Sequence, residues 1–368
     1  MISRAFATFA FSLIAALVCA DVGIAIAQNT SGSGDLRQAL FAVPVSPGAG
    51  LFQTRSTEQK ETSAEVTKDG PILRRRDTAI DAGYLNQMLA ANAAISADGK
   101  VTANAVAFSM NLLPDVTLHV VKQQSRVDEL GNTVWQGLVV EEEGTATLII
   151  HDDRVTGEVR VGTRKFGIAP AAVDHAVVEY RQDDKWQRED VSPKSGTVPN
   201  AANGAISPSR TVERQGTERL AADSPSISVM IVYTAAALRQ KPDMTGAISL
   251  ALADLRTTFS NSLITATVTL AGANQTTYEE LENESSDDIL NDAMIGAGDF
   301  ARIRQLQRTS NADILSVWAD YRDNCGLAGG RFYDGNPADA DLADAAYASV
   351  NTVSIICDAA TFTHEVGL

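Results

Sequence analysis

The chain has 368 residues, a formal net charge of −16 and 45% hydrophobic residues. This length suffices for two domains and a targeting segment, and the apolar content excludes a wholly disordered chain. The strong negative charge argues against nucleic acid or an anionic membrane surface as a partner.

Residues 1–27 have the pattern of a secretory signal peptide. Arg4 supplies the positive charge, an apolar core runs from Phe6 to Val18, and small residues from Ala25 to Ala27 form a cleavage site. A transmembrane anchor is the alternative, but the short core and Asp21 disfavour it. We therefore expect a chain that is secreted, to the periplasm or the extracellular medium, with no stable membrane anchor.

The chain contains three cysteines, Cys19, Cys325 and Cys357. Cleavage of the signal peptide removes Cys19, and the residues before it lack the small side chains that precede a lipoprotein cysteine. One pair then remains in an oxidising compartment, which favours a disulfide between Cys325 and Cys357. Two separate buried thiols are the alternative.

Residues 28–100 are predicted to be a mobile leader with one helix. The first part, Gln28 to Gly70, is rich in Ser, Gly, Thr and Pro and has no sustained period. Helical spacing of apolar residues then predicts one amphipathic helix around Ile80, Tyr84, Leu85, Met88 and Leu89.

Residues 101–182 are predicted to form a compact antiparallel β-domain. Short β-runs separated by turn residues indicate this, and the clearest are Thr117–Val121, Thr133–Val140, Thr145–Ile150, Gly157–Val161 and His175–Tyr180. His119, His151 and His175 share no ligand spacing, so we interpret each as an ordinary strand or turn residue.

Residues 183–225 are charged at first and then dominated by Ser, Pro, Gly, Asn and Ala. This composition predicts a linker, which is a natural place for proteolytic cleavage. Residues 226–368 alternate strand and helix patterns instead, beginning with Ile227, Val229, Ile231 and Tyr233 on one face of a strand. The alternation predicts an α/β sandwich with a largely parallel sheet.

The chain ends in Thr361-Phe362-Thr363-His364-Glu365-Val366-Gly367-Leu368. His-Glu followed by two small or apolar residues begins the pattern H-E-x-x-H, in which two imidazoles one helical turn apart bind one zinc ion. Position 368, where the second His belongs, is Leu. The interpretation of this pattern as a zinc motif therefore depends on whether the rest of the chain resembles a metalloprotease.

Four stretches, in this order, resemble the bacterial reprolysin-like metzincin proteases, the peptidyl-Asp metalloendopeptidases in particular. They are Ile227–Thr234 for the opening strand, Asn311–Ser316 for the central strand, Cys325–Ala328 for the start of the edge strand, and Ser354–Gly367 for the last strand and zinc helix. The β-domain resembles the propeptide of such enzymes at Lys165–Ile168 and His175–Glu179.

The resemblance implies an α/β fold in which a β-rich propeptide domain precedes the N-terminal part of a metzincin catalytic domain, with a mixed, mostly parallel sheet. It implies the zymogen of a secreted zinc metalloendopeptidase that acts on proteins or peptides. His364 matches the first zinc ligand and Glu365 the general base. In such a zymogen the β-domain would be an intramolecular propeptide, with Asp174 and His175 as candidates to cap the zinc.

The second and third His, the Gly between them and the Met-turn of the family have no counterpart in this chain. We therefore expect a chain that is truncated within the motif and is inactive as it stands. The alternative is a non-catalytic secreted remnant whose β-domain acts as a binding or inhibitory module.

Two further patterns have plain interpretations. Asp339, Asp341 and Asp344 are spaced like calcium ligands, but Pro337 before them favours a solvated helix start. Gly326 and its neighbours lack the spacing of a phosphate loop, so we expect them to let a substrate backbone or a tight turn come close.

Overall fold

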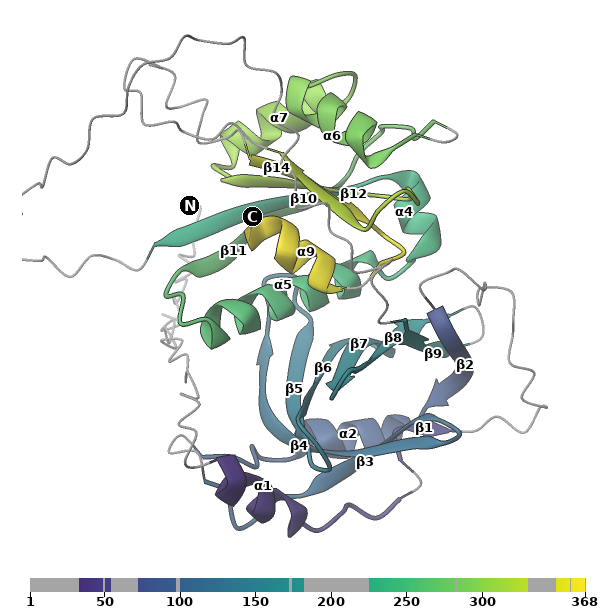
Figure 1. The fold of residues 1–368 in the computed structure, drawn as a ribbon, viewed down its shortest axis with the longest axis vertical. Helices are drawn as coiled ribbons and strands as arrows, with labels where there is room; N and C mark the ends of the chain where they lie inside the picture. Colours follow the sequence, from purple (N-terminus) through teal and green to yellow (C-terminus); the bar gives the residue numbers. More distant parts are fainter. Residues whose placement is uncertain are drawn as a thin grey trace, which may run out of the picture.

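A computed structural model describes residues 33–48, 50–53, 72–96, 100–171, 174–181, 225–281, 284–329, 349–357 and 359–367. These residues form a mixed α/β structure with a large antiparallel sheet and a second, mixed sheet (Figure 1). The predicted signal peptide, most of the linker, the candidate calcium ligands and Leu368 lie outside them. None of the described helices is long and apolar enough to cross a membrane.

The large sheet has nine strands in the order β1-β2-β9-β8-β7-β6-β5-β4-β3, and all neighbours are antiparallel. Their bounds are β1 Phe52–Gln53, β2 Ile72–Ile80, β3 Ala107–Leu113, β4 Val116–Val127, β5 Thr133–Val139, β6 Gly144–His151, β7 Arg154–Val161, β8 Arg164–Pro170 and β9 His175–Tyr180. Strands β3 to β9 follow the chain in order, as the antiparallel pattern predicts.

The structure corrects the predicted leader. Residues 72–80, which we placed in a mobile segment, form β2 and pair with β9 along its length. Helix α1 (Ser33–Phe41) also lies in that segment. The predicted helix is confirmed as α2 (Ala82–Ala90), except that Ile80 ends β2 instead.

Two-residue turns join the central strands of the large sheet. Asp152-Asp153 connects β6 to β7, and Gly162-Thr163 connects β7 to β8. Asp152 and Gly162 each have a φ of 54°, the left-handed conformation that the tight turns of twisted hairpins require. These turns place β7 in the middle of the sheet, where it contacts helix α5 (Met244–Asn261).

The sheet curves around α2, which supplies the centre of its core (Figure 1). Asp81 caps the helix by accepting a hydrogen bond from the Tyr84 backbone N–H. Tyr84, Leu85 and Met88 are buried against the sheet. Trp135 is fully buried, and its indole N–H donates to the Met88 carbonyl at 3.3 Å, so this large side chain has its one donor satisfied.

The second sheet has the order β11-β10-β12-β14-β13. Its strands are β10 Ser226–Tyr233, β11 Thr267–Gln275, β12 Ile314–Ala319, β13 Gly326–Gly329 and β14 Ser349–Ser354. The first four in this order are parallel to one another, and β13 is an antiparallel edge strand. The prediction of a largely parallel α/β sheet is therefore confirmed.

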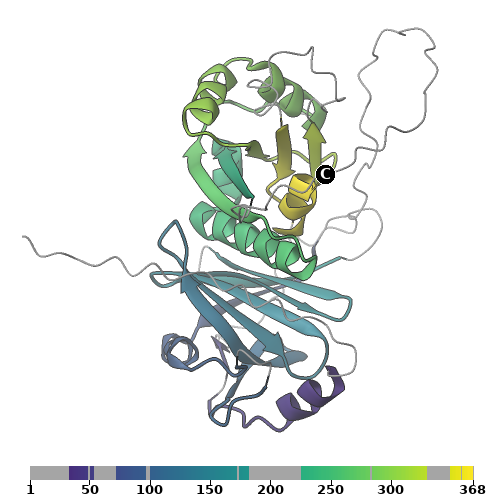
Figure 2. The ribbon, with the colours of Figure 1, turned by 90° about the vertical axis from the view of Figure 1, so that its left-hand side faces the viewer.

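Helices cover both faces of this mixed sheet. They are α4 Ala235–Gln240, α5 Met244–Asn261, α6 Ser286–Ile295, α7 Phe300–Thr309 and α9 Ala359–Gly367. Apolar residues of α5 and α9 form one core with the sheet, and those of α6 and α7 form another on the opposite face. Helix α5 thus lies between the mixed sheet and the large curved sheet (Figure 2).

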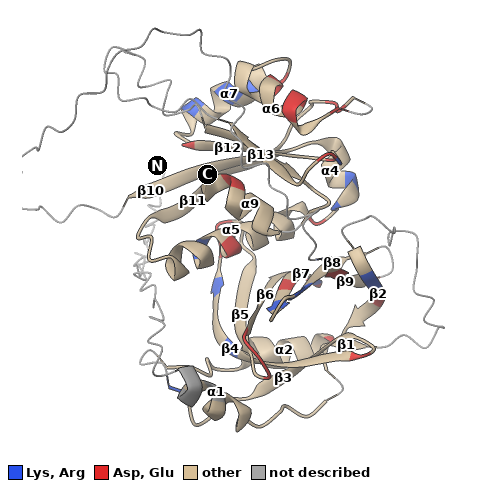
Figure 3. Cartoon of the chain, in the orientation of Figure 1, with Lys and Arg blue, Asp and Glu red and all other residues tan. Residues whose placement is uncertain are grey.

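Polar contacts connect the large sheet to α5. Asn132 donates to the Ser249 hydroxyl at 2.8 Å, and Thr156 donates to Asp243 at 2.5 Å. Basic and acidic residues occur on both sides of this boundary (Figure 3), and Glu129 forms an ion pair with Arg256 of α5. Polar bonds therefore contribute to this contact beside its apolar packing.

The Glu129–Arg256 pair predicts a pH-dependent contribution to stability. Burial acts to raise the pKa of Glu129, but the hydrogen bonds and charge of Arg256 outweigh it and hold the pKa below the ordinary value of 4.5. Because the folded-state pKa is lowered, the pair stabilises the fold above pH 4.5 and stops doing so as the pH falls through that lowered value.

We expect Glu129→Gln to lower the unfolding temperature near neutral pH, and to lower it less at acid pH, where protonation removes the charge of Glu129 in the unaltered chain. Thermal unfolding followed by circular dichroism measures this difference. Glu143→Gln, on an exposed turn, is the control. A Glu129→Gln deficit of equal size at both pH values would contradict the assignment.

Candidate active site

Helix α9 carries the His-Glu pair and is positioned by its apolar face. Phe362 is fully buried, and its ring lies 6.0 Å from that of Trp318 in β12, edge to face. Contacts with α5, β13 and β14 surround the rest of the helix. A helix of nine residues is marginal by itself, so these contacts determine where His364 and Glu365 lie.

Glu365 points toward the edge strand of the mixed sheet. Its side chain is 5% exposed and lies against Gly326, the first residue of β13. A Cβ atom on Gly326 would be 2.4 Å from Oε1 of Glu365 and 2.8 Å from its carboxyl carbon. The sequence-based interpretation expected a substrate backbone or a tight turn at Gly326, whereas the structure places the Glu365 side chain there.

His364 is half-buried, and its Nε2 atom is shielded from solvent. The other three His of the chain belong to the large sheet, in β4, β6 and β9. Among the described residues no group of three or more His, Cys, Asp or Glu is arranged to hold a metal ion. Catalytic zinc requires three protein ligands and a water, so His364 with the other described residues does not form a complete zinc site.

His175 does not fit the role of a zinc cap. Its Nε2 atom accepts a hydrogen bond from the Val155 backbone N–H at 2.9 Å, and its Nδ1 atom bonds the Asp174 carboxylate. The ring is 4% exposed inside the large sheet. With both nitrogens engaged in the fold, His175 stabilises the β7–β9 region instead.

The disulfide between Cys325 and Cys357 is present, with a Cα–Cα distance of 5.7 Å. It joins the residue before β13 to the turn that precedes α9. Beside it, the Ser354 backbone N–H donates to the Cys325 carbonyl at 2.7 Å. The bridge therefore attaches the edge strand to the start of the helix that bears Glu365.

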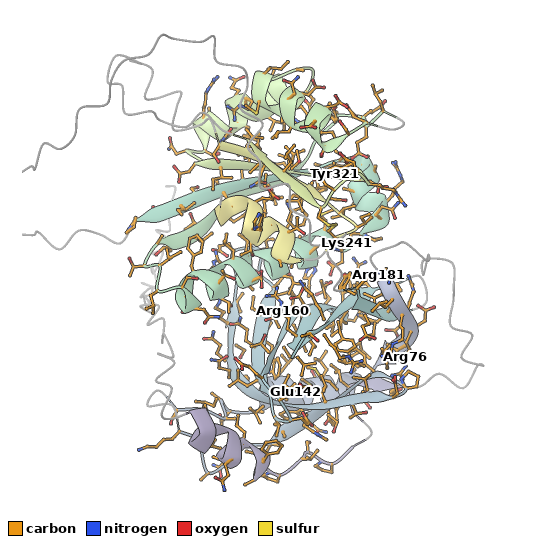
Figure 4. All side chains as sticks on the ribbon, in the orientation of Figure 1. Arg76, Glu142, Arg160, Arg181, Lys241 and Tyr321 are labelled. Carbon is orange, nitrogen blue, oxygen red and sulfur yellow. A yellow bond between two sulfur atoms is a disulfide. The ribbon has the colours of Figure 1, made fainter. Side chains whose placement is uncertain are left out.

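Tyr321 is a residue of this region that the sequence analysis did not single out. It follows β12, is 2% exposed, and its hydroxyl lies 3.2 Å from Oγ1 of Thr352 (Figure 4). Burial raises the pKa of the Tyr321 phenol well above its ordinary value, and the charge of Glu365 raises it further. A neutral phenol therefore lies within electrostatic range of the Glu365 carboxylate.

Comparison with known proteins gives a distant relative. The chain is 25% identical over 377 residues to the peptidyl-Asp metalloendopeptidase of Xanthomonas campestris pv. campestris, which covers 95% of this chain and 79% of that protein. No model of a protein family matches the chain.

Two solved structures show weaker similarity. Metalloproteinase-II from Bacteroides fragilis has a TM-score of 0.42 and 12% identity, over 78% of this chain and 82% of that chain. A chaperone–substrate complex has a TM-score of 0.30 and 11% identity, over 57% of this chain and 26% of that chain. Neither TM-score is high enough to define the fold.

The close approach of Glu365 to Gly326 predicts a sensitive position. We expect Gly326→Ala to displace the Glu365 side chain and to lower the free energy of unfolding by about 1–3 kcal/mol, the usual cost of overpacking a buried site. Urea denaturation of the purified chain measures this change.

Two further variants test whether the loss of stability in Gly326→Ala arises from the contact with Glu365. Adding Glu365→Ala should remove most of the cost of Gly326→Ala, because the atoms that meet the new methyl group are then absent. Gly367→Ala is the control, since no atom lies within 4 Å of a Cβ there. A Gly326→Ala chain of undiminished stability would show that Glu365 does not lie against Gly326.

Proposed function

We propose that this chain is the precursor of a secreted zinc-dependent metalloendopeptidase. The observation that carries the proposal is its similarity to a peptidyl-Asp metalloendopeptidase, which extends over 95% of the chain. The His-Glu pair supports it, because it lies on the helix that follows the last parallel strand of the mixed sheet. Its expected substrates are proteins and peptides.

In this proposal His364 is one zinc ligand and Glu365 is the general base. The described residues supply one imidazole at this place, so the metal needs two further protein ligands. Zinc, when bound, supplies a Lewis acid that activates water at neutral pH. As the base, Glu365 would accept a proton near the edge of the sheet, and its burial supports this role because its neighbours exclude most solvent.

The edge strand β13 suggests how a substrate would be held. It pairs with β14 on one side and is the last strand of its sheet. An extended peptide can add to such an edge through backbone hydrogen bonds. A peptide on β13 would pass close to Gly326, and therefore to Glu365.

The precursor state is also part of the proposal. The signal peptide pattern and the Cys325–Cys357 disulfide are both typical of export to an oxidising compartment. The nine-stranded sheet would be the intramolecular propeptide, released by cleavage in residues 183–225. His175 is not retained as a zinc cap, because both of its ring nitrogens are bonded within the sheet, and Asp174 is the partner of one of them.

The chain by itself is expected to bind zinc weakly or not at all, because one imidazole cannot provide the affinity of a three-ligand site. Equilibrium dialysis against zinc, followed by metal analysis of the protein, measures this directly. One tightly held zinc per chain would contradict the ligand assignment.

Completing the motif tests the activity. We expect a chain with Leu368→His, extended by a metzincin tail that carries the Gly and the third His, to show chelator-sensitive peptidase activity. Glu365→Gln in that protein should lower kcat by about 10²–10⁴-fold, the usual contribution of a general base, while zinc remains bound. Glu279→Gln, at an exposed position, is the matched control.

The outcomes separate the competing functions. Undiminished cleavage by the Glu365→Gln protein would show that Glu365 is not the base. A folded, extended protein that binds zinc but cleaves no peptide would favour the alternative, a non-catalytic secreted protein whose nine-stranded sheet acts as a binding or inhibitory module.

A further inference from the structure

One carboxylate of α5 is shared by the nine-stranded sheet and by α9. Asp254 Oδ1 forms an ion pair with Arg160 Nη2 of β7 at 2.7 Å. Its other oxygen, Oδ2, accepts a hydrogen bond from the Thr363 hydroxyl at 2.6 Å. Figure 4 shows Arg160 on the large sheet beneath α5. A continuous chain of polar contacts therefore runs from β7 through α5 to the residue before His364.

Arg160 is itself fixed by the sheet. Its Nε donates to Glu158, two residues earlier on the same face of β7, and Glu158 pairs with Lys165 of β8 at 3.2 Å. The side chains of Glu158 and Lys165 are each 8% exposed, and that of Asp254 is 14% exposed. The Arg160 side chain is 39% exposed, so water screens its pair with Asp254 more than it screens the Glu158–Lys165 pair. Because Asp254 is largely buried, losing its partner is still expected to have a measurable effect.

Apolar packing at the same boundary also reaches α9. Val134 and Ile149 of the large sheet form a small buried cluster with Leu250 and Ala253 of α5, and Ala359 packs against it. Ala359 is the first residue of α9. The nine-stranded sheet thus supports α9 at its first turn as well as through Asp254.

The two sides of α9 are held by different contacts. Thr363 is tied to Asp254 on the α5 side, and Glu365 lies against Gly326 on the β13 side. Rotation of the helix about its axis would break one contact or the other. Because α9 is short, such contacts decide the orientation of the His364–Glu365 turn.

We propose that Asp254 is a positioning residue for the His364–Glu365 turn, and that Arg160 of the nine-stranded sheet orients its carboxylate. The sheet then stabilises the helix of the candidate active site, in addition to any role in latency. The inference rests on the proposed function for the role of His364 and Glu365, but the contacts themselves do not require zinc or substrate.

A double-mutant cycle on the full chain tests this coupling. Arg160→Met removes the ion pair, and Thr363→Val removes the hydroxyl with little change of shape. We expect each to speed amide hydrogen exchange in residues 359–367 by about five-fold, the size of effect expected when one ion pair or one hydrogen bond is lost. The double variant should exceed the larger single effect by less than about two-fold, because both changes act through Asp254.

Gln136→Met provides the matched control. Gln136 and Arg160 line the same cavity of about 110 Å³ between the sheet and α5. Gln136 donates to the Thr257 hydroxyl of α5 at 3.0 Å, one turn beyond Asp254. We expect this variant to leave exchange in α9 within about two-fold of the unaltered chain, and to add to Thr363→Val without coupling.

The His364 imidazole gives a second readout. Its ¹⁵N chemical shifts should change in Arg160→Met and return toward the original values in Arg160→Lys, which keeps the charge. If Arg160→Met fails to fold, Asp254→Asn serves instead, since it keeps an acceptor for Thr363 but loses the charge that pairs with Arg160.

The results distinguish the two proposals. Additive effects of Arg160→Met and Thr363→Val, or equal changes from Gln136→Met, would overturn the positioning role. Both readouts are made without metal or substrate, so they stand whether or not the extended protein cleaves peptides.

Discussion

The structure depends on the burial of α5 from both sides. Eleven of its 18 residues are buried, although a helix at the surface of a domain normally has one polar face. One side packs on the mixed sheet and α9, and the other on the large curved sheet. Small residues make this possible: at Gly246, a Cβ atom would be 2.8 Å from the Thr156 hydroxyl of β7. Helix α5 therefore contributes to the packing of both sheets.

Much of the fold could be predicted from local patterns. Runs of β-forming residues between turn residues predict β4 to β7 and β9, and runs such as Ile227–Tyr233 predict the parallel strands. The disulfide follows from counting the cysteines that remain after the expected removal of residues 1–27. The strands could be predicted because the periodicity of a strand or helix is visible within a short stretch of the sequence.

Strand β2 shows where such patterns fail. Its Arg74-Arg75-Arg76 run looks like a solvated basic patch, but Arg74 pairs with Asp115 and Glu179, and Arg76 donates to the Asn111 carbonyl. Those partners are 41, 105 and 35 residues away in the chain. A local periodicity cannot encode such distant pairings.

The candidate site could be predicted only in part, for the same physical reason. The motif identifies His364 and Glu365, whereas Asp254 and Tyr321 are brought near them by tertiary packing.

Each sheet is built from its own continuous part of the chain, strands β1 to β9 within residues 52–180 and strands β10 to β14 within residues 226–354. Among the described residues, no strand is exchanged between the two sheets. A single cut in residues 183–225 would therefore leave each described sheet uninterrupted, with the described side-chain contacts across α5 between them. From that moment their association would follow mass action, whereas in the uncut chain the connection maintains a high effective concentration. Dilution, rather than unfolding, would then separate the two parts.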